Sequence, residues 1–172
     1  MKNTEVFHSS LRSRLKYILP TCIYLIVDIV AVIYLTMKYG ASDILLYIKL
    51  GGIAFLIIFL PTLIIHMQYY FKNKNVSLEF DYLRRTIYYR SSTEETTFSF
   101  DNIVNFIKYI HPALYEKREG WLPWERYSYV ILKLDDDKKV FITCFLINQF
   151  DLSIDEEKKT VNKVFFPFIR DE

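Results

Sequence analysis

Two long apolar stretches dominate the first part of the chain. The first covers residues 17–37 and contains one ionisable side chain besides tyrosine, Asp28. The second covers residues 44–66, and its part from Leu50 to Ile65 contains none. A helix of roughly 20 apolar residues spans the hydrocarbon core of a bilayer. The pattern therefore predicts a transmembrane hairpin over residues 17–67, with helices at about 17–37 and 44–66.

Two other interpretations of these stretches fit less well. A cleaved signal peptide has a shorter apolar core that ends at small residues, whereas here a long first stretch leads into a second one. A helix of a soluble bundle has a polar face with a period of 3.6 residues, and neither stretch has one. We therefore expect the hairpin to lie in a membrane.

Positive charges flank the hairpin on one side. Four bases precede the first helix and four follow the second, whereas the link at residues 38–43 carries one base and one acid. By the positive-inside rule, we expect a multi-pass protein of the cell inner membrane with both termini in the cytoplasm. The basic N-terminal segment, residues 1–16, is either a helix on the membrane surface or a frayed lead-in. The flanking bases are Lys2, Arg12, Arg14 and Lys16, then Lys72, Lys74, Arg84 and Arg85.

After His66 the pattern changes to an alternation of polar and apolar residues. A period of two predicts β-strands. Six strands are expected, in the segments VSLEFDY, RRTIYYR, TTFSF, NIVNFIKYI, YSYVILKL and KVFITCF. The charged turn at residues 135–138 suits a hairpin between the last two. The fold class is therefore an α+β membrane protein, whose cytoplasmic residues 68–172 form an antiparallel sheet or small barrel.

The C-terminal tail lacks strand alternation from about Leu146 to Lys163. It contains several residue types that begin helices, because their short polar side chains cap free backbone amides. We expect one short C-terminal helix here, with Asp151, Ser153 or Asp155 as its cap.

Composition and motifs give no sign of catalysis. The net charge is +2, too small to indicate a nucleic-acid-binding protein. Cys22 and Cys144 lie far apart and form neither a metal motif nor a disulfide framework. No histidine is placed with an acid or cysteine at zinc spacing, and no glycine-rich phosphate loop is present. We expect no enzymatic activity, no cofactor and no metal.

Three segments carry a resemblance to a known family. They are VSLEFDYLRRTIYYR, TTFSFDNIVNFIKY and YVILKLDDDKKVFIT. With the apolar hairpin ahead of them, they resemble bacterial membrane-anchored PH-like proteins, which include the YcxB-like group. The resemblance implies a PH-like β-barrel closed by a terminal helix. The chain departs from that family in the long insertion HPALYEKREGWLPWERY and in its tail.

Three sets of residues are candidates for contacts. The inserted loop carries Tyr115, Trp121, Leu122 and Trp124, and such an aromatic cluster packs on its own barrel, on the bilayer interface or on a protein partner. The bases Lys72, Lys74, Arg84 and Arg85 attract lipid headgroups or are simply a topology signal with ordinary strand charges. Asp28, with Lys49 as its possible partner, marks an intramembrane contact.

Two functional hypotheses follow. The first is a non-catalytic, membrane-tethered module that recruits or blocks a protein partner, for example an immunity protein against a membrane-acting secreted toxin. The second is a small accessory subunit of a transporter, channel or secretion complex, in which the hairpin and Asp28 are the working part. We expect membrane lipid as a partner, and a protein or a second copy of the chain through the hairpin and the tryptophan-rich loop.

Overall fold

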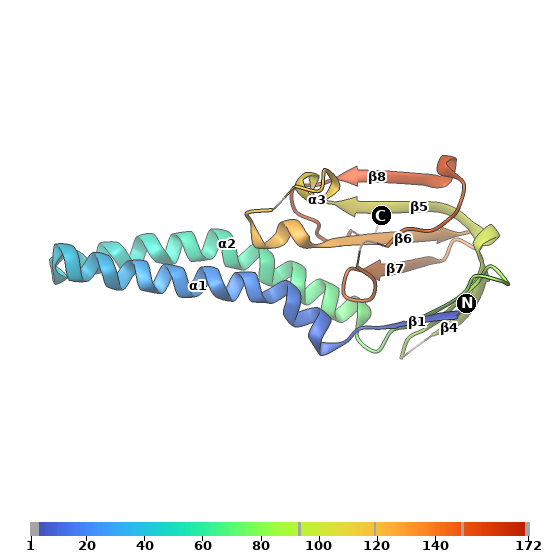
Figure 1. Ribbon diagram of the computed structural model, residues 1–172, viewed down its shortest axis with the longest axis horizontal. Coiled ribbons are helices and arrows are strands. Elements are labelled where there is room, and N and C mark those ends of the chain that lie inside the picture. Colours follow the sequence, from blue (N-terminus) through green and yellow to red (C-terminus); the bar gives the residue numbers. More distant parts are fainter. Residues whose placement is uncertain (1–3, 93, 119, 149, 171–172) are drawn as a thin grey trace.

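A computed structural model describes residues 4–170, except residues 93, 119 and 149. Lys2, one of the flanking bases, lies outside this range. Two long helices form an antiparallel hairpin that projects from a β domain (Figure 1). They are α1 (Leu11–Tyr39) and α2 (Ile44–Asn73), joined by the 3-10 turn η1 (Ala41–Asp43). Both helices are longer than the apolar stretches.

The ends of α1 have clear local causes. Ser10 caps its first turn, because the Ser10 hydroxyl accepts a hydrogen bond of 3.0 Å from the amide of Ser13. Gly40 ends the helix with a φ of 93°, a conformation that glycine adopts without steric cost.

Both helices are long and apolar enough to cross a membrane. In the most apolar stretch of α1, 6% of the residues are buried, and in that of α2, 17%. A core helix of a soluble protein would be mostly buried there. Leucine, isoleucine and valine side chains along both helices are instead exposed.

The described residues of the β domain form two four-stranded sheets. The first has the strand order β1-β2-β3-β4 and is antiparallel throughout. The second has the order β7-β6-β5-β8, in which β8 pairs parallel to β5. The strands are β1 (Thr4–His8), β2 (Ser77–Asp81), β3 (Thr86–Arg90), β4 (Glu95–Ser99), β5 (Ile103–Ile110), β6 (Ser128–Leu134), β7 (Lys139–Thr143) and β8 (Lys159–Lys163).

Short helical turns connect some of the strands. These are η2 (Phe100–Asn102), α3 (Pro112–Tyr115), η3 (Pro123–Arg126) and η4 (Glu156–Lys158). All six strands expected from the alternation are present, as β2 to β7. The α+β class is also confirmed, with antiparallel-rich sheets following the two apolar helices.

The main core lies between the two sheets. Alternate residues of the first sheet, such as Leu78, Phe80 and Ile87, point inward and meet Phe106 and Leu132 of the second. The connection after β7 contributes Leu146, Phe150 and Leu152 to this core. An irregular segment thus buries apolar side chains where a PH-like barrel was expected to carry a closing helix.

A second core joins the other face of the second sheet to the hairpin. Tyr109, Tyr129 and Ile131 of β5 and β6 pack against Ile65 and Tyr69 of α2. Strand β6 is therefore buried on both faces, which explains its nearly continuous apolar sequence YVIL. The tail after β8 covers the same face, since the Tyr69 hydroxyl donates to the carbonyl of Pro167 at 2.9 Å.

Both ends of the chain differ from expectation. The described part of the N-terminal segment, residues 4–16, forms β1 and the first turns of α1 in place of a surface helix or a frayed lead-in. At the other end, the short C-terminal helix is the single 3-10 turn η4, with Asp155 at its N-cap position. The strand β8, which follows directly, was not expected.

Candidate functional site

Polar contacts fix the base of the hairpin to the β domain. The Tyr17 hydroxyl donates to Asn148 Oδ1 at 2.9 Å, and the Ser13 hydroxyl donates to the carbonyl of Phe145 at 2.8 Å. On α2, His66 Nδ1 lies 2.9 Å from the hydroxyl of Tyr127. Together with the second core, these contacts make the helix bases and the second sheet one packed unit.

The end of α2 is held by a fully buried amide. Asn73 Nδ2 donates to the carbonyl of Phe141 at 3.2 Å, and Asn73 Oδ1 accepts from the backbone amide of Thr143 at 3.0 Å. The hydroxyl of Thr143 also donates to Asn73 Oδ1. One side chain therefore satisfies three polar groups of the neighbouring strand β7, two of them buried.

The two tryptophans of the inserted loop have opposite environments. Trp124 is 3% exposed and packs against Phe166 in the second core. Trp121 is 84% exposed, and its backbone carbonyl accepts a hydrogen bond from the hydroxyl of Tyr24 on α1. The expected aromatic cluster is thus divided. The Trp124 side chain packs on its own domain, whereas the Trp121 side chain is exposed beside the hairpin.

The other two predicted loop residues also separate. Leu122 is half-buried against the second core. Tyr115 is exposed, and the Lys163 ammonium lies 4.0 Å from the centre of its ring. The structure therefore leaves Trp121 and Tyr115 accessible from this set.

A buried histidine and glutamate shape the loop. His111 Nδ1 accepts from the amide of Ala113 at 3.2 Å and so caps α3. Its Nε2 lies 3.8 Å from Glu125 Oε1, and Glu125 Oε2 accepts from the amide of Leu122 at 3.2 Å. Burial lowers the pKa of His111; the Glu125 carboxylate opposes this shift and the charge of Arg118 adds to it.

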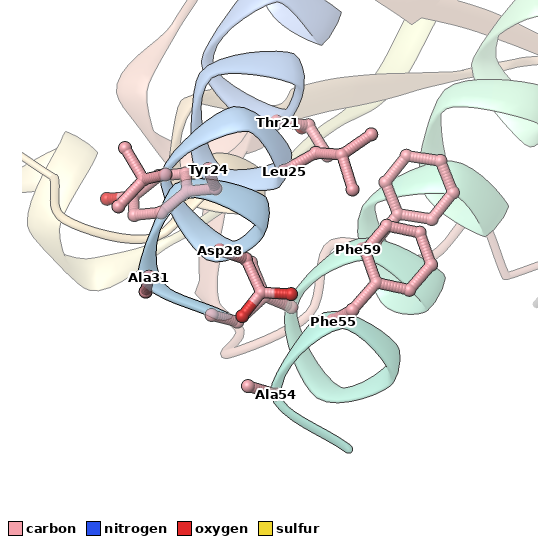
Figure 2. Close-up of a pocket in the computed structure, with 10 residues that line it drawn as sticks. Thr21, Tyr24, Leu25, Asp28, Ala31, Ala54, Phe55 and Phe59 are labelled. Atoms are coloured by element: carbon pink, nitrogen blue, oxygen red, sulfur yellow. The ribbon is translucent and has the colours of Figure 1, made fainter. Parts of the chain in front are cut away.

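Asp28 lines a cavity between the two helices (Figure 2). The cavity has a volume of about 220 Å³ and is otherwise lined mainly by apolar residues, Phe55 and Phe59 among them. The buried hydroxyl of Thr21, which also lines it, has no hydrogen-bond partner. Within the part of the chain that the structure describes, Asp28 forms no hydrogen bond or ion pair.

Asp28 lies against Gly51 of α2 and forms no pair with Lys49. A Cβ atom added to Gly51 would lie 3.3 Å from Asp28 Oδ1 and 3.0 Å from Val32 Cγ2. A side chain at this position would be tightly packed, so glycine favours the close approach of the two helices. The Lys49 side chain is exposed, and among the described residues it forms no ion pair with Asp28.

Two of the bases proposed for lipid lie far from the hairpin. Strand β2 begins beside His8, three residues before α1, and ends beside Thr4 at the other end of the sheet. Arg84 and Arg85 follow that distant end and pair with Asp81 and Asp101. Their expected place next to the membrane exit is wrong, because β2 leads the chain away from the helices.

The other two bases proposed for lipid are near the end of α2. The Lys72 ammonium lies 4.2 Å from the centre of the Phe141 ring. The Lys74 ammonium lies 5.9 Å from the centre of the Tyr70 ring. Both therefore contact aromatic rings at the junction, the region where the bases of α1 and α2 pack against the β domain.

Among the described residues, no group of three histidine, cysteine, aspartate or glutamate side chains is placed to hold a metal ion. Cys144 is buried in the second core, and burial raises the pKa of its thiol to about 12. A thiol with such a pKa is a poor nucleophile near neutral pH, since the thiolate is the reactive form.

A family model described as PH domain matches residues 6–153. The chain belongs to the PH domain family. The matched range includes both helices of the hairpin and ends after β7, so β8 of this PH domain lies beyond it. No curated protein and no solved structure matches the chain significantly.

Several residues of the junction were not found from the sequence. Asn73 lies in the polar stretch KNKN at the end of α2, and Tyr24 is one of several tyrosines of the hairpin, so neither residue stands out in the sequence. Nothing in the sequence distinguished the exposed Trp121 from the buried Trp124 of the PH domain.

Proposed function

We propose that this chain is a non-catalytic binding module, tethered by its hairpin to a bacterial inner membrane, that recruits or blocks a protein partner there. The observation that carries the proposal is the shared core of hairpin and PH domain. Tyr17, Ile65 and Tyr69 of the helices are buried against the second sheet, so the module has a defined orientation on its anchor. A tether raises the local concentration of the domain at the membrane.

The distribution of bases supports the orientation. Arg12, Arg14 and Lys16 precede the exposed part of the hairpin, and Lys72 and Lys74 follow it. By the positive-inside rule, this bias supports an orientation with the PH domain on the cytoplasmic side. A specific form of the proposal is an immunity protein that binds a secreted toxin acting at the inner membrane.

A second candidate function rests on Asp28. An ionised aspartate near the centre of a membrane helix costs about 2.5–3.5 kcal/mol on insertion scales. Asp28 lines the interhelical cavity beside the unpartnered Thr21 hydroxyl. This arrangement favours a small accessory subunit of a transporter, channel or secretion complex that contacts its partner inside the membrane.

Photocrosslinking in living cells distinguishes the two functions. A photoreactive residue at Tyr88, Val104 or Tyr115 samples exposed positions of the PH domain, and one at Val30 samples the exposed surface of α1. The tethered module predicts crosslinks to a protein partner from the PH domain and none from Val30. The accessory subunit predicts the reverse pattern.

Removal of the Asp28 carboxylate provides an independent test of the two functions. Protection of susceptible cells in competition with a toxin-producing strain measures immunity. Under the first proposal, Asp28→Asn retains full protection, as does the matched variant Asp43→Asn in the link between the helices. Loss of protection with Asp28→Asn alone, at unchanged protein level, would show that the hairpin is the working part.

A further inference from the structure

The inserted loop reaches farther along the hairpin than any other part of the PH domain (Figure 1). Its Trp121 carbonyl accepts a hydrogen bond from the Tyr24 hydroxyl. From Tyr24 to the end of α1 at Tyr39, the helix rises about 22 Å. The hydrocarbon core of a bilayer is about 30 Å thick. If the outer boundary of this core lies at Tyr39, the core extends about 8 Å beyond Tyr24 toward the PH domain. Any tilt of the helices increases this distance along α1.

The exposed Trp121 side chain falls at the inner boundary of that core. Side chains of a helix tilt toward its N-terminus, so the Tyr24 hydroxyl lies on the PH-domain side of its own Cα. Trp121, beside that hydroxyl, is thus close to the level where acyl chains meet headgroups. Tryptophan favours this level because its ring is apolar and its N–H is polar.

Basic side chains surround a hollow next to this loop. The hollow has a volume of about 420 Å³, and Lys16, Arg118 and Arg126 line it together with Tyr17 and Asn148. Lys16 lies about 12 Å from Tyr24 along α1, toward the N-terminus of the helix. It is therefore about 4 Å beyond the hydrocarbon core, within a headgroup layer of roughly 5–7 Å on each side of the bilayer.

Some charged side chains around the hollow already have partners within the protein. Arg118 pairs with Glu116 at 2.8 Å, and the Glu125 carboxylate is buried and accepts from the amide of Leu122. Lys16 and Arg126 are exposed, and neither forms an ion pair with another described residue. Lys16 at headgroup depth and Arg126 in the same hollow, beside an aromatic ring near the acyl boundary, complement an anionic phospholipid.

We propose that this junction binds an anionic phospholipid of the cytoplasmic leaflet. Lys16 and Arg126 contact the headgroup phosphate, and Trp121 packs against the first part of the acyl chains. The site holds the inserted loop on the membrane surface and so fixes the PH domain against the bilayer. This inference rests on the proposed membrane tether.

Tryptophan fluorescence in nanodiscs tests the depth of the loop. The full chain, Trp121→Phe, and Trp121→Phe with Val30→Trp are compared in lipids that carry a nitroxide at a shallow or a deep position. The difference between the full chain and Trp121→Phe isolates Trp121, since the buried Trp124 is common to both. We expect strong quenching of Trp121 by the shallow nitroxide, and of Val30→Trp by the deep one.

The failures of the two proposals are distinguishable in this experiment. If Trp121 is unquenched while Val30→Trp is quenched, the tether stands and the lipid site is refuted. If Val30→Trp is also unquenched, the hairpin does not span the bilayer and both proposals fail.

Native mass spectrometry of protein extracted from mixed phosphatidylglycerol and phosphatidylcholine bilayers tests the bases. Lys16→Gln with Arg126→Gln should reduce the enrichment of phosphatidylglycerol by roughly fivefold for each base removed. The matched control, Arg84→Gln with Arg85→Gln, removes the same charge at the distant end of the first sheet and should change nothing. Equal loss in both pairs would refute the site. Displacement of the lipid by inorganic phosphate would show a soluble-phosphate site and would also overturn the proposal.

Discussion

The hydroxyl of Tyr24 on α1 donates a hydrogen bond to the backbone carbonyl of Trp121 in the inserted loop. This bond joins the hairpin to the PH domain nearer the tip of the hairpin than the shared core at Tyr17 and Tyr69. It therefore holds the inserted loop against the hairpin and positions the backbone that carries the exposed Trp121 ring.

Removal of this bond should release the loop. Tyr24→Phe removes one hydrogen bond, worth about 1 kcal/mol, and should raise the population of the open loop roughly fivefold. Trypsin cleavage after Lys117 or Arg118 measures that population when the loop opens and closes rapidly. Tyr34→Phe, on the same helix but away from the PH domain, should leave the cleavage rate unchanged. Equal cleavage of the two variants would show that the Tyr24 bond does not hold the loop.

The buried amide of Asn73 should be a main source of stability at the junction. Asn73→Ala leaves the backbone groups of Thr143 and Phe141 without their partner, at a cost of about 2–3 kcal/mol. Thermal unfolding of the full chain in detergent measures the loss. Asn105→Ala, at an exposed position of β5, is the matched control and should have little effect. A similar small effect for both would contradict the role given to Asn73.

The neighbouring glycines of α2 should differ sharply in their tolerance of larger side chains. Gly51 faces Asp28 and Val32, whereas a Cβ added to Gly52 meets no atom within 4 Å. We expect Gly51→Leu to separate the helices and to destabilise the hairpin by about 1–3 kcal/mol, and Gly52→Leu to be nearly neutral. Thermal unfolding in the same detergent compares the two. Greater damage from Gly52→Leu would show that the helices pack by a different face.

Acid should weaken the inserted loop through His111. Burial lowers the pKa of His111 in the folded protein, so the unfolded chain binds a proton first as the pH falls below about 6.5. Stability is therefore lost as the pH falls from there to the lower pKa of the folded state. His111→Asn keeps an acceptor for the amide of Ala113 and removes the titration. Unfolding curves between about pH 7 and pH 5 should show a smaller loss of stability for this variant than for the parent. An equal loss of stability would show that groups other than His111 cause the effect.

The strands that the sequence predicted have at least one buried face, and β6 has two. In β2, Leu78 and Phe80 point into the core and their neighbours outward, which gives a clear period of two. Strands β1 and β8 lie at sheet edges and are largely exposed. Their sequences, TEVFH and KTVNK, lack an apolar row, and their pairing depends on neighbours that are distant in sequence.

The candidate site was predictable in kind but not in position. The sequence predicted contacts for the tryptophan-rich loop and the basic flanks. It could not separate Trp121 from Trp124, because the direction of a loop side chain depends on the packing of Phe166 and other distant residues. It also placed Arg84 and Arg85 near the membrane, since closeness along the chain does not show that β2 runs away from the helices.

The central claim is that the hairpin crosses the membrane and holds the PH domain on its cytoplasmic face. Labelling with a membrane-impermeant maleimide tests it most directly, with single cysteines Ser42→Cys or Ser92→Cys in a chain that carries Cys22→Ala and Cys144→Ala. Both serines are exposed, the first between the helices and the second between β3 and β4. We predict that Ser42→Cys is labelled in intact spheroplasts and Ser92→Cys only after lysis. Labelling of Ser92→Cys in intact spheroplasts, or protection of Ser42→Cys until lysis, would contradict the account.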